Sequence, residues 1–254
     1  MRAYSQFIIP ALAFAVIFAT PAQAGFFERL LGDRLASVED GSYIAGDKIK
    51  FGIVRAGKNF LLRFDGDPET FVLSSDRTSM GARLLKYDTG ETAIRVAGWG
   101  ALTLYTEWQP NGLPAVRTGD VPPFAPAPVS LQDVQFIADQ EATRFAKVYH
   151  LRVVFLVDWS VLETSGTLRA TASAALENAS RGLEQFVVNK DGRKLVAKRI
   201  RRITLATGHR PMLQLQDRTL IVTFNPEEGY AGCASSRAIT RELWPIFSTE
   251  KKHA

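Results

Sequence analysis

The chain of 254 residues contains a single cysteine, Cys233, so no disulfide can form within one molecule. It also lacks the glycine-rich phosphate loops, the paired metal-ligating histidines, the nucleophile elbow and the CxxC pairs that mark the commonest enzyme and cofactor classes. No run after the first 24 residues is apolar for the roughly 20 residues that a spanning helix needs. We therefore expect stability to come from packing, and we expect no cofactor and no metal.

The first 24 residues have the three parts of a secretory signal peptide. Arg2 supplies the charge, residues 7–18 form an apolar run, and small residues at Ala22 and Ala24 precede a cleavage point. An uncleaved anchor is the alternative, but this apolar run is shorter than the roughly 20 residues needed to cross a bilayer. We predict cleavage after Ala24, export to the periplasm or the medium, and no transmembrane span in the mature chain.

Composition and charge limit the class of protein. Hydrophobic residues make up 46% and charged residues 22% of the chain, which is typical of a globular fold rather than of a disordered or fibrous one. The formal charge of +5 falls to +4 when Arg2 is removed with the signal peptide. In an exported protein this modest basic excess favours anionic envelope polymers or lipid headgroups as partners over nucleic acid.

Residues 25–109 predict a small antiparallel β domain, a sandwich, roll or barrel, preceded by a short amphipathic helix over residues 26–35. Short apolar runs alternate there with turn signals that contain glycine, such as Asp65-Gly66 and Thr89-Gly90. Spacing of this kind is typical of strands joined by hairpins. The expected strands cover residues 49–54, 60–64, 71–73, 82–85, 93–96 and 102–105.

Residues 110–129 predict an extended connector between two domains. Six of the twelve prolines fall in this stretch, and no amphipathic period continues through it. Proline fixes φ and removes a backbone donor, so a segment of this composition runs extended and semi-rigid. We place the domain boundary here.

Residues 130–247 predict an α+β layer domain with helices packed on a mixed sheet, followed by a tail at 248–254. The segment 131–148 has one apolar helical stripe, and the segment 151–157 is a nearly continuous apolar run typical of a buried strand. Alternating helical and strand patterns of this kind indicate a layered domain. The other expected elements are a helix at 166–188, strands at 195–205, 212–215 and 218–224, and a helix at 236–243 that stops at Pro245.

Two segments of the β region carry a resemblance to a known family. Leu61-Leu62-Arg63-Phe64-Asp65-Gly66-Asp67-Pro68-Glu69-Thr70-Phe71-Val72-Leu73 and the later Gly100-Ala101-Leu102-Thr103-Leu104 are similar to a pattern in a family of exported bacterial proteins of unknown function. The resemblance lies mainly within residues 61–104, and its motifs are structural rather than catalytic. It therefore implies no catalytic or binding residues.

Cys233 is the most suggestive candidate for a catalytic residue. It precedes a predicted helix, whose positive N-terminal end stabilises a thiolate. With His150 or His209 as the base, and Asp158 at the end of a predicted strand as an assisting carboxylate, it would form the site of a hydrolase or transferase. The alternative is a buried, inert cysteine, which the absence of a family-type motif around it favours.

A dense basic segment at residues 190–202 is the strongest candidate for a binding site. It contains one acid, Asp191, and could hold anionic polymers or headgroups; the alternative is a solvated strand edge. Its seven basic residues are Lys190, Arg193, Lys194, Lys198, Arg199, Arg201 and Arg202.

Two smaller clusters have ordinary structural explanations. Asp65, Asp67 and Glu69 could gather oxygen ligands for calcium, but the twelve-residue loop pattern is incomplete and a solvated turn is favoured. The aromatic residues near the end of the β region could stack on sugars or a peptide, although packing is the commoner use; they are Trp99, Tyr105 and Trp108.

Together these patterns favour an exported, soluble, non-catalytic binding or accessory protein of the cell envelope. Its partner would be another envelope protein or an anionic surface, contacted through the basic segment. A hydrolase or transferase of the envelope with a Cys-His site is the alternative.

Overall fold

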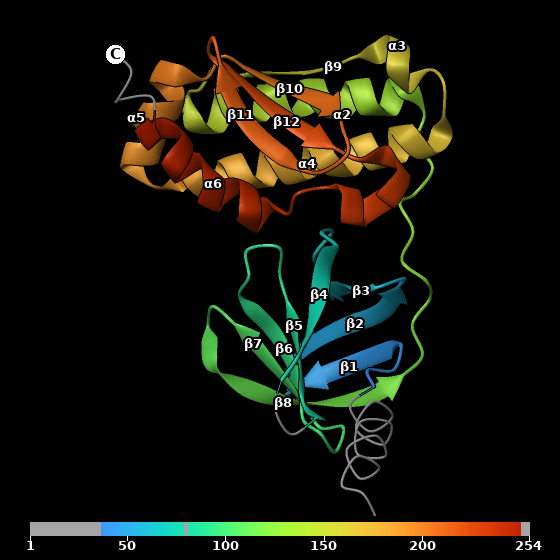
Figure 1. Cartoon of the computed structure of the whole chain (residues 1–254). Helices are drawn as coiled ribbons and strands as arrows, with labels where there is room; N and C mark the ends of the chain where they lie inside the picture. Colours follow the sequence, from blue (N-terminus) through green and yellow to red (C-terminus); the bar gives the residue numbers. More distant parts are fainter. Residues whose placement is uncertain (1–36, 79–80, 250–254) are drawn as a thin grey trace, which may run out of the picture.

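The computed structural model describes residues 37–78 and 81–249, which form a β-barrel and a helix-and-sheet domain (Figure 1). The predicted signal peptide (1–24) and leading helix (26–35) lie outside the described residues, as do positions 250–254 of the predicted tail. The chain has an α+β architecture, as expected. No helix in the described ranges is both long and apolar enough to cross a membrane.

Eight antiparallel strands close into a barrel in which each strand pairs with the next and the last pairs with the first. Inward-facing residues alternate with outward-facing ones, and the interior is filled by aromatic and aliphatic side chains such as Phe51, Leu62 and Phe71. The predicted antiparallel β domain is in line with this barrel. Its strands are β1 (Gly41–Ala45), β2 (Ile49–Ala56), β3 (Asn59–Phe64), β4 (Phe71–Arg77), β5 (Arg83–Lys86), β6 (Thr92–Val96), β7 (Leu102–Thr106) and β8 (Gln109–Gly119).

The strand β8 overturns part of the predicted connector. Residues 110–119 pair with β7 and β1 instead of running free between domains. Proline is compatible with this pairing because its φ suits an extended strand and its carbonyl still accepts: the backbone N–H of Gly46 donates to the oxygen of Pro114 at 3.1 Å. The first strand of the barrel, β1, was not among the expected strands.

The remaining connector crosses the outside of the barrel before it reaches the second domain (Figure 1). The ring of Phe124 lies under the guanidinium of Arg63, 4.5 Å from ring centroid to the carbon of the cation. A Cβ at Gly52 would be 2.7 Å from Cζ of Phe124, so glycine leaves the space that this ring occupies. The connector is therefore attached to the barrel by its own side chains.

The second domain places helices on one face of a four-stranded mixed sheet. Parallel strands β9, β10 and β12 are joined by the antiparallel edge strand β11 in the order β11-β12-β10-β9. The central helix α4 packs against α2, α5 and α6. The elements are α2 (Leu131–Arg144), a π-helix (Phe145–Tyr149), β9 (Val154–Val157), α3 (Trp159–Leu162), α4 (Gly166–Val188), α5 (Lys190–Arg199), β10 (Arg202–Thr207), β11 (Met212–Gln216), β12 (Thr219–Phe224), a 3-10 helix (Pro226–Gly232) and α6 (Ser236–Thr249).

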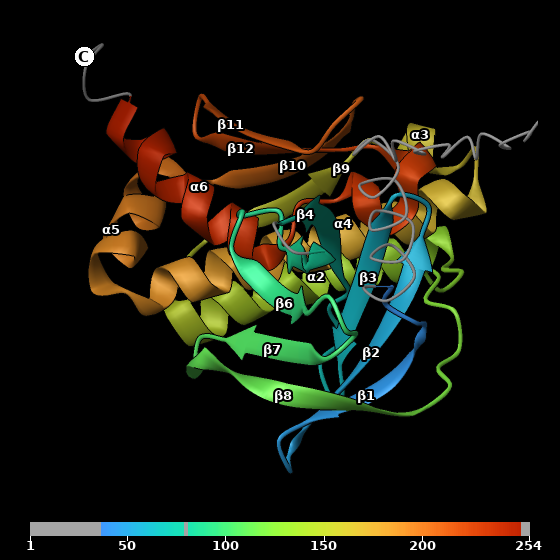
Figure 2. The same cartoon turned by 60° about the horizontal axis from the view of Figure 1, so that its bottom comes forward.

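The other face of this sheet is not covered by the helices of the domain (Figure 2). Along β9, Phe155 and Val157 are buried under the helices, whereas Val154 and Leu156 are 47% and 39% exposed. Parallel sheets usually have both faces covered, so this open face is unusual for its class.

Three predicted elements of this domain were wrong in part. Residues 190–199 form the helix α5 rather than a solvated strand edge, and the strand that follows begins only at Arg202. Asn189 explains the helix, because its side-chain oxygen accepts from the backbone N–H groups of Asp191 and Gly192 and so caps α5. The last helix continues through Pro245 to Thr249, beyond its predicted end.

Candidate functional site

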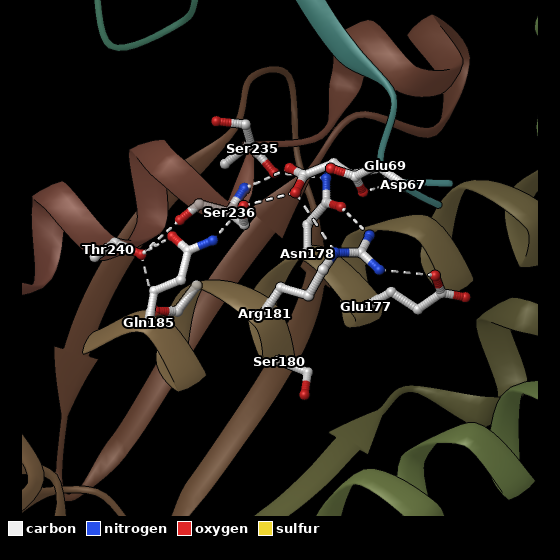
Figure 3. A network of polar contacts seen from close by, with 12 residues as sticks. Asp67, Glu69, Glu177, Asn178, Ser180, Arg181, Gln185, Ser235, Ser236 and Thr240 are labelled. Carbon is white, nitrogen blue, oxygen red and sulfur yellow. Dashed lines mark hydrogen bonds and ion pairs between the residues drawn. The ribbon is translucent and has the colours of Figure 1, made fainter. Parts of the chain in front are cut away.

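The barrel and the second domain are joined by carboxylates of the barrel that cap the start of α6. The backbone N–H and the hydroxyl of Ser236 donate to the two carboxylate oxygens of Glu69 at 2.8 and 2.6 Å (Figure 3). Ser235 makes the equivalent pair of bonds to Asp88, at 2.8 and 2.7 Å. Helix starts have free N–H groups and a positive dipole, so two carboxylates there bind favourably.

Arg181, on α4, completes this interdomain network, which comprises Glu69, Asp88, Arg181, Ser235 and Ser236. Its Nε is 3.5 Å from Oε2 of Glu69, within ion-pair distance but without hydrogen-bond geometry to any described residue. Its other nitrogens bind Glu177 and Asn178 (Figure 3). The arrangement joins α4, α6 and the barrel at one point.

Glu69 is the most buried of the barrel's charged residues, with 3% of its surface exposed. Burial raises the pKa of its carboxyl group, while the hydrogen bonds from Ser236 and the charge of Arg181 act in the opposite direction. The sequence favoured a solvated turn over a calcium site for Asp65, Asp67 and Glu69, and for Glu69 this prediction was wrong because the carboxylate is buried against Ser236. Among the described residues no group of three or more metal-ligating side chains is placed to hold a metal ion.

A second set of contacts joins the same faces at the edge of the interface. The guanidinium of Arg237 on α6 pairs with Glu107 of the β7–β8 turn and lies 4.5 Å from the ring centroid of Tyr87. Burial raises the pKa of Tyr87 to about 12, so its hydroxyl is neutral. Arg241 donates to the backbone oxygen of Thr89 one turn further along α6. The two domains are thus held by several independent polar contacts.

Between these contacts lies a cavity of about 680 Å³ at the mouth of the barrel, which we call the mouth cavity. Barrel mouths and domain interfaces are common places for small-molecule sites, whose volumes are typically about 300–1,000 Å³. The barrel contributes Ile49, Phe64, Asp67, Glu69, Phe71, Tyr87, Thr106, Glu107 and Trp108. The helices contribute Arg181, Gln185, Ser236, Arg237 and Thr240.

The structure buries Cys233, leaving 7% of its surface exposed. Its thiol lies 3.6 Å from the backbone oxygens of Thr171 and Gly229, and no described histidine hydrogen-bonds to it. Burial raises the pKa of this thiol to about 12, which opposes the thiolate that a nucleophile requires. The helix start that was expected to activate it is already capped by Asp88 and Glu69.

The other members of the predicted Cys-His site occupy separate places. His150 is exposed at the end of the π-helix, in a left-handed conformation with φ of 56°. His209 is exposed in the connection from β10 to β11, where its backbone oxygen accepts from Asn225. Asp158 is exposed after β9. The contacts of Cys233 therefore include none of these three residues.

The basic segment divides into two kinds of residue. Arg193 and Arg199 are partly buried: they donate to the backbone oxygens of Val187 and Phe247 and lie over the rings of Tyr149 and Phe247. Five of the seven are exposed: Lys190, Lys194, Lys198, Arg201 and Arg202.

The fold brings two further arginines, Arg152 and Arg218, beside the basic segment. The backbone N–H of Arg201 donates to the oxygen of Arg218 at 2.8 Å, and its own oxygen accepts from Val154, two residues after Arg152. Both Arg152 and Arg218 are exposed. Because β9, β10 and β12 run parallel, their first residues lie together at one end of the sheet, where the three strands begin. Only this topology, and not the sequence spacing, brings the two residues beside the basic segment.

Fold and interface together define an α+β protein in which a closed eight-stranded barrel is fixed to the N-terminal end of the helix α6. A family model described as a domain of unknown function (DUF4908) matches residues 28–243, so the chain belongs to that family. Neither a curated protein nor a solved structure matches it. The expected membership of a family without an assigned activity is confirmed, and the match extends over the second domain as well as the barrel.

Proposed function

We propose that the chain is an exported, non-catalytic binding protein of the cell envelope that holds phosphate-bearing anionic surfaces. The observation that carries the proposal is a group of exposed basic side chains at the end of the sheet where β9, β10 and β12 begin. We call this group the basic patch. Its members are Arg152, Lys198, Arg201, Arg202 and Arg218.

The charge of the basic patch is not neutralised within the described part of the chain. None of its five side chains forms an ion pair there; the nearest pair along the chain joins Lys194 to Asp191, both well exposed. Uncompensated cations of this kind attract anionic surfaces, at about 1 kcal/mol for each residue close to a charged bilayer. Screening by salt shortens the range of the attraction to about 8 Å at physiological ionic strength.

The open face of the sheet supports headgroups as the source of the phosphates. Arg202 pairs with Val154 across β10 and β9, so that exposed aliphatic side chains continue directly from the basic patch. Met212, on the opposite edge strand, is 38% exposed. Amphipathic helices that lie in a membrane interface combine basic residues with an apolar face in a comparable way.

The location in the envelope rests on the composition of the first 24 residues. Expression of the full chain in a host that exports proteins, followed by sequencing of the N-terminus, tests it. A mature protein that begins at Gly25 supports export, and an intact N-terminus in the cytoplasm contradicts it.

Sedimentation with lipid vesicles tests the binding surface. We expect binding to vesicles that contain anionic phospholipid, no binding to purely zwitterionic vesicles, and loss of binding as salt is raised. Soluble polyphosphate, used as a competitor and as a ligand, distinguishes a polymer from a lipid headgroup as the source of the phosphates.

Charge reversal identifies the surface. Lys198→Glu, Arg201→Glu and Arg202→Glu combined should abolish sedimentation with anionic vesicles. The matched control reverses three exposed basic residues of the barrel, Lys48, Lys58 and Arg95, and changes the net charge equally. Equal losses in both triple variants would show only a net-charge effect, and no loss in the first would refute the basic patch.

A further inference from the structure

The mouth cavity has a lining without net positive charge, which limits what it can bind. Three carboxylates and two guanidiniums line it, a formal charge of −1, and both guanidiniums are already paired with carboxylates. The cavity therefore differs from the basic patch, and a polyanion is not its ligand.

The lining combines aromatic surface with groups that both donate and accept hydrogen bonds. Phe64, Phe71 and Tyr87 form the barrel side, with their rings in edge contact. On the helix side, the amide of Gln185 and the hydroxyl of Thr240 offer both donors and acceptors (Figure 3). A ligand that complements this lining has an apolar face and several uncharged hydroxyl groups.

Trp108 is the most exposed large hydrophobic residue of the described chain, at 87%, and it lies at the rim of this cavity. Exposure alone is no sign of a site, since Trp99 is 78% exposed and does not line the mouth cavity. The position of Trp108 beside Glu107 is what distinguishes it, because the indole face and the carboxylate, which is 70% exposed, border the same cavity.

We propose that the mouth cavity binds a neutral saccharide, one sugar ring of which stacks on Trp108 while its hydroxyl groups bond to Glu107 and Gln185. A sugar ring has an apolar C–H face for the indole and hydroxyl groups that both donate and accept. The site lies on the barrel and on α4 and α6, away from the basic patch, so it does not depend on the proposed surface binding.

Calorimetric titration of the mature protein with neutral di- to tetrasaccharides of glucose and of N-acetylglucosamine tests the proposal. We expect binding by at least one series, and a loss of about tenfold or more in affinity for Trp108→Ala. The matched control, Trp99→Ala, removes a similarly exposed indole from the β6–β7 turn and should stay within about twofold of the wild type. Neither change should affect folding, because both side chains are in solvent.

A second variant tests the polar side of the site. Gln185→Ala should also weaken saccharide binding, while thermal unfolding reports separately on the contacts that Gln185 makes with Ser236 and Thr240. The Lys198, Arg201 and Arg202 reversal variant should bind saccharide as the wild type does.

Three results would overturn the proposal. The first is no binding by any of these saccharides at about 1 mM, which corresponds to a binding free energy weaker than about −4 kcal/mol. The second is an equal loss for Trp108→Ala and Trp99→Ala. The third is a preference for acidic saccharides that salt removes, which would indicate the basic patch as their site instead.

Discussion

Removing the carboxylate of Glu69 should weaken the association between the barrel and the second domain. In the variant Glu69→Ala, the backbone N–H and the hydroxyl of Ser236 lose their acceptor, and both groups are buried. Arg181 loses the carboxylate that lies 3.5 Å from its Nε. The contacts of Asp88 and of the arginines further along α6 would remain between the barrel and this helix.

The magnitude follows from the two hydrogen bonds. A bond to a charged group contributes about 1.5–3 kcal/mol, and donors left buried without an acceptor keep the cost of their desolvation. Two bonds at the lower value give a loss of about 3 kcal/mol in the free energy of unfolding. The ion pair with Arg181 is left outside this figure, because it lacks hydrogen-bond geometry and Arg181 keeps its pair with Glu177.

Urea unfolding followed by tryptophan fluorescence and by far-UV circular dichroism measures this loss. Two further variants provide reference values for this loss in the free energy of unfolding. Asp88→Ala removes an exposed carboxylate that caps the same helix, and should cost about 1 kcal/mol because water can replace it. Asp76→Ala breaks one partly exposed ion pair with Lys86, between the barrel strands β4 and β5, and should cost at most about 1 kcal/mol.

The three losses in the free energy of unfolding, taken in order of size, test whether the bonds to Glu69 hold the interface. Glu69→Ala should be the most destabilising, and its two domains should unfold in separate transitions if the network holds them together. A loss for Glu69→Ala no larger than that for Asp76→Ala would refute the reasoning, because it would mean that the buried bonds to Ser236 contribute nothing to the interface.

Three further predictions follow from single buried groups. The thiol of Cys233, with its pKa raised by burial to about 12, should resist alkylation until the protein unfolds; rapid labelling of the folded protein would contradict this. Thr106→Val should leave the melting temperature unchanged or raise it, because the buried hydroxyl has no hydrogen-bond partner among the described residues; a clear decrease would contradict this. Because the pKa of Glu69 is raised above 4.5, the folded state keeps a proton that the unfolded chain has already released. This protonation therefore stabilises the fold at low pH, and the stabilisation decreases as the pH rises from 4.5 through the folded pKa of Glu69. Glu69→Gln should remove that part of the pH dependence, as measured by urea midpoints across the acid range.

Elements that depend on local pattern could be predicted from the sequence. The helix expected at 166–188 is α4 at those bounds, because its small and aliphatic residues recur with a helical period and one face is buried. The strand expected at 60–64 lies within β3 for the corresponding reason, since Phe60 and Leu62 alternate with side chains on the other face. Burial of one face is a local property, so it leaves a local signal.

The strand β8 and the helix α5 could not be predicted in this way. Proline in β8 suggests a free connector unless the partner strand is known, and here the partner is β1, about 70 residues earlier in the chain. The interleaved aliphatic and basic residues of α5 suit a strand as well as a helix. Its capping by Asn189 was the available signal, and the strand period obscured it.

The interdomain network was missed because its members are far apart in the sequence. Glu69 and Ser236 are separated by 167 positions, and nothing near either residue specifies the other. Ser235 and Ser236 lie at the start of the helix, where serine is a common N-cap, and the hydroxyl of Ser235 accepts from the backbone N–H of Ala238. That the caps would be occupied by carboxylates from another domain is a property of the tertiary structure alone.

A ligand in the mouth cavity would act on the same interface that the network holds together. The cavity is lined by residues of both domains, including Glu69 and Ser236 themselves. A ligand that binds only when the two faces are assembled adds its binding free energy to that assembly, as any ligand of the native state does. Saccharide should therefore raise the melting temperature of the wild type, and it should bind Glu69→Ala more weakly although Trp108 is unchanged. Equal affinity for both proteins would place the sugar on the barrel rim alone, outside the interface.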